Sequence, residues 1–211
     1  MVDEVDVREV ASAEAAAKAT GLEVPEVDDL PQGVTGEPGF EVIGEVSGVF
    51  TFSVDEARRA AGAGGETLPP PPSGIDGSRF RLVAGPGLAA IWSEERGLPA
   101  LVVARAVAPT AYSSGVPFET ARDYLLSLPG LPADVSSQLR SFSADGATLP
   151  FPVPEDLMTS SSTDVDGVDA TLLEARDGTM AAVIWVEDGV VTAVAGSVTD
   201  DEVLAVARGL G

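Results

Sequence analysis

Residues 164–196 read DVDGVDATLLEARDGTMAAVIWVEDGVVTAVAG, and this stretch decides the fold. It holds three Asp-Gly pairs at nearly even spacing, at Asp166-Gly167, Asp177-Gly178 and Asp188-Gly189. Asp-Gly is a strong hairpin signal, because a type I′ turn needs a positive φ at both central residues. Between and after these pairs lie the runs Val168–Ala175, Thr179–Glu187 and Val190–Gly196. The stretch therefore predicts an antiparallel meander whose strands are joined by tight Asp-Gly hairpins of type I′.

The segments on either side of the meander predict a closing helix and a loop. Thr199-Asp-Asp-Glu202 is a capping box, so a helix is expected from there to Arg208. At helical spacing, Val203, Ala207 and Leu210 would face the sheet. Before the meander, Thr159–Thr163 consists of hydroxyl residues and predicts a loop.

The rest of the chain inserts helices between antiparallel strands, which is typical of the α+β class. Helices are predicted at Ser12–Thr20, which Gly21 ends, at Val54–Ala61, and as a helical hairpin over about residues 117–142. One or two strands are predicted over Phe40–Phe52, and single strands at Ser78–Ala84, Leu88–Ser93 and Ala100–Ala108. A Pro-rich surface loop is expected over about residues 67–74.

We therefore predict a single α+β domain over residues 1–211. Its centre is a curved antiparallel sheet that contains the Asp-Gly meander, is packed with helices, and is closed by the C-terminal helix.

The charge balance excludes two classes of partner. The 211 residues include 12 Lys and Arg against 34 Asp and Glu, which gives a net charge of −22. Nucleic acid binding needs a cationic footprint, and direct binding to an anionic membrane surface needs basic residues. We expect neither of these partners, and the sequence does not predict an oligomeric state.

The missing residue types exclude several catalytic and metal-binding chemistries. The chain has no His and no Cys, so it has no Ser-His-Asp triad, no Cys-His dyad, no structural zinc site and no disulfide. Lys18 is the single lysine, and its place in an Ala-rich segment does not favour a Ser-Lys dyad. Neither a Walker A loop nor a G-x-S-x-G elbow occurs.

Two acidic segments invite a functional interpretation, and in each the structural one is favoured. Asp164-Val-Asp166-Gly-Val-Asp169 with Glu174 resembles a calcium loop, but its glycine stands at position 4, where an EF-hand loop has it at position 6. A hairpin turn is the better interpretation, and calcium binding there stays open. Asp200, Asp201 and Glu202 are expected to stabilise a helix N-terminus.

The remaining candidates for functional residues are the few aromatic residues and one run of glycines. Trp92, Trp185, Tyr112 and Tyr124 stand out by their rarity, and the tryptophans are expected in the core. Gly62–Gly65 lacks a following Lys and is interpreted as a loop. We assign no catalytic, cofactor-binding or metal-binding residue, and we predict no cofactor.

Both ends of the chain resemble a known bacterial family. The first part is Ala13-Glu-Ala-Ala-Ala-Lys-Ala-Thr-Gly-Leu, followed by Val24-Pro and by Leu30-Pro-Gln-Gly33. The second comprises Val165-Asp-Gly-Val-Asp-Ala, Ile184-Trp-Val, Ala195-Gly-Ser and Thr199–Leu210. These segments, about half of the chain, resemble an extracytoplasmic domain of unknown function found in anti-sigma factors and predicted lipoproteins. That domain is similar in style to carriers and sensors of the lipoprotein-sorting superfamily.

The resemblance implies a location and two alternative functions. It implies an antiparallel sheet curved around helices and a place in the cell envelope or outside the cell. By itself, the acidic start Met1–Asp6 is unlike a signal peptide and predicts a cytoplasmic location if Met1 is the native start. Our first hypothesis is a non-enzymatic sensor or interaction domain of a membrane-associated protein, with an unknown protein partner. The alternative is a lipid or lipoprotein carrier that uses a concave apolar sheet face, and a carboxylate-based hydrolase is a third possibility.

Overall fold

A computed structural model describes residues 6–60, 69–93, 99–130 and 157–210, together with positions 136 and 140. It divides the chain into two compact units, and each is described by itself. The smaller unit draws on residues 46–84 and 109–152, and the larger one on residues 5–45, 85–108 and 153–211. The single-domain organisation stays a prediction. Among the described residues, no helix combines the length and the apolar character needed to cross a membrane.

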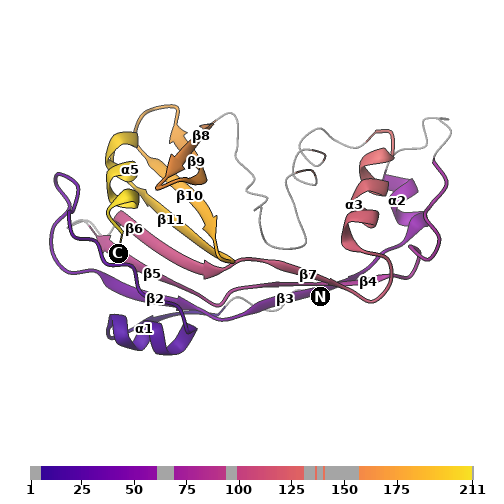
Figure 1. Cartoon of the computed structure of the whole chain (residues 1–211), viewed down its shortest axis with the longest axis horizontal. Coiled ribbons are helices and arrows are strands. Elements are labelled where there is room, and N and C mark those ends of the chain that lie inside the picture. Colours follow the sequence, from indigo (N-terminus) through magenta and orange to yellow (C-terminus); the bar gives the residue numbers. More distant parts are fainter. Residues whose placement is uncertain are drawn as a thin grey trace. The chain divides into compact units, whose positions relative to one another are not determined.

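The larger unit is built on an antiparallel sheet of eight strands, and it confirms the predicted α+β class (Figure 1). In order across the sheet, the strands are β1 (Val7–Val10), β2 (Gly39–Ile43), β5 (Gly87–Ser93), β6 (Pro99–Val107), β11 (Val190–Gly196), β10 (Ala181–Glu187), β9 (Val168–Ala175) and β8 (Met158–Val165). The predicted meander is therefore present as β9, β10 and β11, and β6 pairs with β11 to join it to the earlier strands.

Two of the three Asp-Gly turns have the predicted geometry. Asp166 and Asp188 have φ angles of 51° and 50°, and the glycine that follows each also has a positive φ, as a type I′ turn requires. The prediction was wrong at Asp177, where only Gly178 has a positive φ and residues 176–180 form a longer connection. There the Asp177 carboxylate accepts hydrogen bonds from the hydroxyl and the backbone N–H of Thr179. These bonds, the hydroxyl one first, lower the pKa of Asp177 and close the turn through the side chain.

The predicted loop at Thr159–Thr163 was wrong, because these residues lie within strand β8. Each of them pairs with a residue of β9 in an unbroken register. The strand is the last in the sheet, and the side chains of residues 159–162 are exposed. An edge strand with exposed side chains does not need the apolar alternation by which sequence analysis recognises strands.

Helices α1 (Ala13–Thr20) and α5 (Asp200–Arg208) cover the same face of this sheet at different strands. In α1, the Ser12 hydroxyl accepts from the Ala15 N–H, and Gly21 ends the helix with a φ of 73°. Ala16 of α1 packs with Val42 and Leu88. Leu88 and Ala90 alternate on β5, so they share a face, and Ala90 belongs to the core beneath α5.

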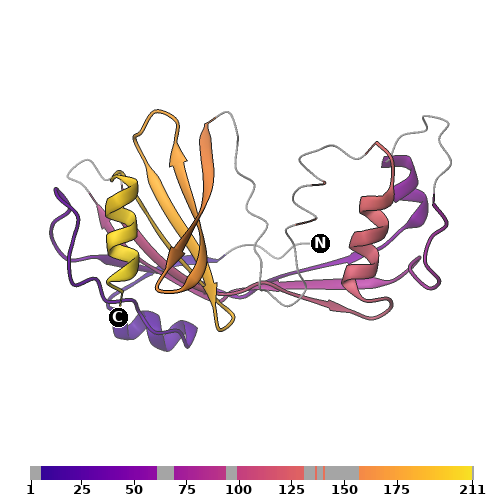
Figure 2. The same ribbon diagram turned by 45° about the horizontal axis from the view of Figure 1, so that its top comes forward.

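The main core lies between α5 and the meander (Figure 2). As predicted, α5 buries Val203 and Ala207 against the sheet, and Leu210 packs at the edge of the same cluster. Both tryptophans lie in this core, with Trp92 5% and Trp185 7% exposed, which confirms that expectation. The cluster further includes Leu101, Val103, Leu172, Val183, Val194 and Val206.

The smaller unit contains a three-stranded antiparallel sheet and two helices. Its elements are β3 (Val46–Thr51), β4 (Arg79–Ala84) and β7 (Thr110–Ser113), with α2 (Val54–Ala60) and α3 (Phe118–Ser127). Phe80, Phe52 and Tyr124 are the large aromatic residues of its core. Helix α3 confirms the first half of the predicted helical hairpin. The second half apart from positions 136 and 140, residues 67–68 and Gly62–Gly65 lie outside the described residues. Residues 69–74 of the Pro-rich loop are described, and as predicted they form neither helix nor strand.

Candidate functional site

A row of three side chains crosses the middle of the eight-stranded sheet on the face that α5 covers. The register pairs Trp185 of β10 with Thr192 of β11, and Thr192 with Arg105 of β6. Paired residues in neighbouring strands point to the same face, and strands lie about 4.8 Å apart, so Trp185 and Arg105 stand roughly 10 Å from each other across the sheet. Burial alternates along β10 and β11, which places Trp185 and Thr192 on the inward side.

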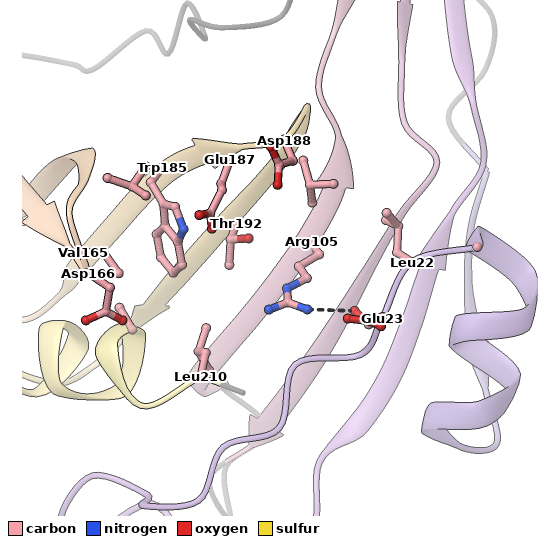
Figure 3. Close-up of a pocket in the computed structure, with 14 residues that line it drawn as sticks. Leu22, Glu23, Arg105, Val165, Asp166, Trp185, Glu187, Asp188, Thr192 and Leu210 are labelled. Atoms are coloured by element: carbon pink, nitrogen blue, oxygen red, sulfur yellow. Dashed lines mark hydrogen bonds between the residues drawn. The ribbon is translucent and has the colours of Figure 1, made fainter.

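This row forms the floor of a pocket of about 410 Å³ (Figure 3). Leu22 and Glu23, just after α1, line one side, and Ala207 and Leu210 at the end of α5 line another. The β8–β9 turn at Asp166 and the β10–β11 turn at Asp188 also line it. A pocket of this size is within the usual range for small-molecule sites.

Arg105 is the basic side chain of this pocket, and its guanidinium is only weakly engaged. It donates one hydrogen bond, to the backbone carbonyl of Glu23 at 3.4 Å (Figure 3). Four carboxylates line the same pocket, on Glu23, Asp166, Glu187 and Asp188. Among the described residues, none of these carboxylates forms an ion pair with Arg105. The guanidinium therefore keeps donors for another group.

The floor also contains two buried polar side chains without a partner. Thr192 is 5% exposed and Trp185 7% exposed, and both line the pocket. Within the described part of the chain, nothing hydrogen-bonds the Thr192 hydroxyl or the Trp185 ring N–H. The nitrogen side of the Trp185 ring is turned toward Thr192 and Glu187 in Figure 3. Among the described residues, the side-chain atoms that are both buried and unpartnered are Arg58 Nε and Tyr124 Oη, so the Thr192 hydroxyl and the Trp185 N–H reach the open space of the pocket. There, water or a bound molecule can pair with them.

The sequence candidates contribute to this site only in part. Asp166, from the segment that resembles a calcium loop, lies in a confirmed hairpin turn and lines the pocket. Asp164 and Asp169 of the same segment are an exposed cross-strand pair. In the described residues, no group of three or more acidic side chains has the arrangement of a metal site. Lys18 is exposed in the last turn of α1.

Sequence analysis missed Arg105, Thr192 and Glu187 altogether. The sequence signal for Arg105 is its place as the one charged residue in the apolar run Ala100–Ala108. Charged residues are rarely buried without a partner, so a cation in such a strand indicates a specific role. No local pattern marks Thr192, because its partners come from other strands.

The helix that borders the pocket begins with the predicted capping box. The backbone N–H of Thr199 donates to the Glu202 carboxylate at 2.9 Å, and the Thr199 hydroxyl donates to the same oxygen. The hydroxyl in turn accepts from the Glu202 N–H. These bonds, the backbone one first, hold the pKa of Glu202 below its ordinary value of 4.5.

The lowered pKa predicts how the stability of this helix depends on pH. Because the folded pKa lies below the unfolded one, the stabilisation is complete above pH 4.5 and is lost as the pH falls through the folded pKa. Glu202→Gln removes the titration and keeps the shape of the side chain. We expect the parent chain to be more stable than this variant near neutral pH, and the difference to shrink at about pH 3. Urea unfolding at both pH values measures it, and a constant difference would contradict the prediction.

Comparison of the chain with models of protein families, with curated proteins and with solved structures finds no match. The resemblance to the extracytoplasmic family therefore stays a prediction, and the pocket is the feature of the structure that bears on function.

Proposed function

We propose that the protein is a non-enzymatic, extracytoplasmic sensor or interaction domain of a membrane-associated bacterial protein, and that the pocket is its ligand site. The observation that carries this proposal is the floor of the pocket. The Thr192 hydroxyl and the Trp185 ring N–H face an open cavity and lack hydrogen-bond partners within the described residues. A ligand that fits the pocket can take over the hydrogen bonds that these groups otherwise make to water, and by binding the folded chain alone it stabilises that state.

The lining of the pocket favours a polar ligand over a lipid. A lipid carrier needs a large and mostly apolar cavity, as our alternative hypothesis required. This pocket is ringed by Glu23, Asp166, Glu187 and Asp188, with Arg105 between them. An acyl chain would desolvate these charges without compensation, and an anionic headgroup would meet four carboxylates.

A thermal-shift assay with a panel of polar metabolites tests the proposal. A ligand that binds the folded state alone stabilises it by about 2.7 kcal/mol at a concentration one hundred times its Kd. Val190→Phe places a bulky ring in the pocket, because Val190 lines it. Val191→Phe is the matched control, since the next residue of β11 points to the opposite face.

The expected result is a compound that raises the Tm of the parent chain and of Val191→Phe, and not that of Val190→Phe. A panel without any such compound would overturn the proposal, and so would chemical conversion of the compound, which would indicate an enzyme. Native mass spectrometry of the purified chain, before and after denaturation, provides the second readout. A co-purifying lipid that leaves on denaturation would favour the carrier.

A further inference from the structure

The pocket contains a positive and a negative side chain that do not pair with each other. Arg105 stands on β6, and Glu187 stands two strands away at the end of β10. Both side chains project from the face that forms the pocket floor, because Glu187 is two residues from Trp185. Opposite charges that line one pocket without pairing are available to a ligand that carries both charges.

The Arg105 side of the pocket suits a carboxylate. The guanidinium of Arg105 has five N–H donors in a fork that matches a carboxylate. One of these donors hydrogen-bonds the backbone carbonyl of Glu23. A ligand with an anionic group alone would nonetheless enter a pocket with four carboxylates, and would be repelled by Glu187 and Asp188.

The opposite side of the pocket suits an ammonium group. Glu187 and Asp188 come from the β10–β11 turn, and Asp166 comes from the β8–β9 turn. A ligand with a cationic group alone would leave Arg105 without an anion and would bring a second positive charge beside it. The lining is therefore complementary to a molecule that carries both charges.

The space between the two charged sides is partly apolar and partly polar. Leu22, Val165, Val190 and Leu210 provide apolar surface, and about 410 Å³ accommodates an amino acid or a dipeptide. The unpartnered Thr192 hydroxyl and Trp185 N–H lie in the row between the two sides, and they can hydrogen-bond the polar atoms of such a molecule.

We infer that the pocket binds a small zwitterion with an apolar side chain, of the size of an amino acid or a dipeptide. This inference rests on the proposed function, because it names the ligand class of the same pocket. It stands on three observations: the Arg105 guanidinium, which forms no ion pair among the described residues; the carboxylates of Asp166, Glu187 and Asp188, which lie across the row from it; and the Thr192 hydroxyl and Trp185 N–H, which face the pocket between them.

Trp185 makes the binding measurable, because the chain contains only two tryptophans. Trp92 is buried in the core and does not line the pocket, so Trp92→Phe leaves Trp185 as the single reporter. The full-length variant is titrated with L-leucine and with Leu-Leu as zwitterions. 4-Methylpentanoate carries only the negative charge, isoamylamine only the positive one, and N-acetyl-leucine amide neither. We expect a zwitterion to bind at least about tenfold more tightly than the analogues that lack one or both charges.

Two substitutions assign the charges to the two sides. Arg105→Gln should weaken the binding of the zwitterion by about tenfold, because the contact with its carboxylate is lost. The binding of isoamylamine, which has no carboxylate, should not be weakened. Glu187→Gln should weaken the binding of the zwitterion, because the contact with its ammonium group is lost. The binding of 4-methylpentanoate, which has no ammonium group, should not be weakened. Arg8→Gln and Glu14→Gln change the net charge equally at exposed positions outside the pocket, and they should have no effect on binding. Far-UV circular dichroism verifies that each variant is folded.

The outcomes separate this inference from the proposed function. If N-acetyl-leucine amide binds as tightly as leucine, or if Arg105→Gln changes nothing, the zwitterion class is overturned while the pocket remains a ligand site. If all five probes fail but another compound binds in a way that Val190→Phe abolishes, only the ligand class is wrong. If no compound shows that dependence on Val190, both proposals fall.

Discussion

Gly196→Ala is expected to destabilise the eight-stranded unit by about 3 kcal/mol, at the upper end for overpacking. Gly196 ends β11 beside β6, and a Cβ added there would lie 2.3 Å from the backbone carbonyl oxygen of Ala100. That oxygen accepts a hydrogen bond from the Ser197 N–H, so it belongs to the ladder between the two strands. The strands must separate to admit a methyl group, and Leu101 and Val194 of the core lie next to them.

Gly44→Ala is the matched control for this substitution. Gly44 lies in the same unit, its φ is not positive, and a Cβ added there meets no atom within 4 Å. An alanine that fits without strain stabilises by roughly 0.4–1 kcal/mol through the unfolded state. Urea unfolding followed by the fluorescence of Trp92 and Trp185 measures both variants, because both tryptophans lie in the affected core. Equal midpoints for the two variants would show that the strands are not packed as closely as described.

Phe80→Ala is expected to cost the smaller unit about 3–5 kcal/mol, as for other large aromatic core residues. Phe80 is 0% exposed in the centre of its cluster. Its ring stacks on Phe50 with centroids 5.1 Å apart and meets Phe118 edge-on at 6.0 Å. The substitution removes the ring that joins β3, β4 and α3 through these two contacts.

Hydrogen exchange followed by mass spectrometry measures this effect strand by strand. The amides of β4 and β7 should lose protection, because Phe80 lies in the sheet that they form. Tyr112→Ala in the same sheet is the control, since Tyr112 is 58% exposed and should change protection little. Loss of protection that also reaches β10 and β11 would show that the chain unfolds as one cooperative domain, as the single-domain prediction requires. Unchanged protection in β4 would contradict the described core.

The elements that sequence analysis predicted correctly are those with a local cause. The turns at Asp166 and Asp188 need only the backbone preferences of two adjacent residues, and the capping box at Thr199 needs only four. The two errors have different causes. At Asp177 the cause is local, because the side chain closes a longer turn with Thr179. At Thr159–Thr163 the cause is the position of β8 at the edge of the sheet, where a strand does not need an apolar pattern.

The candidate site could be predicted only in fragments. Asp166 attracted attention as part of an acidic run, and Trp185 as a rare aromatic residue, but neither pattern placed them in one pocket. Arg105 and Thr192 are far apart in the chain and become neighbours because β6 pairs with β11. Strand order and register are properties of the assembled sheet, and a shift of one residue would turn each of these side chains to the other face.

The amino-acid sequence by itself determined the α+β class, the meander, the capped terminal helix and the absence of histidine and cysteine chemistry, because composition, turn chemistry and periodicity are local properties. Only the tertiary structure decided that Trp185, Thr192 and Arg105 form one row and that α1 and α5 cover the same face of the sheet. The physical reason is that a pocket depends on which strands become neighbours, and long-range burial sets that order rather than any local preference.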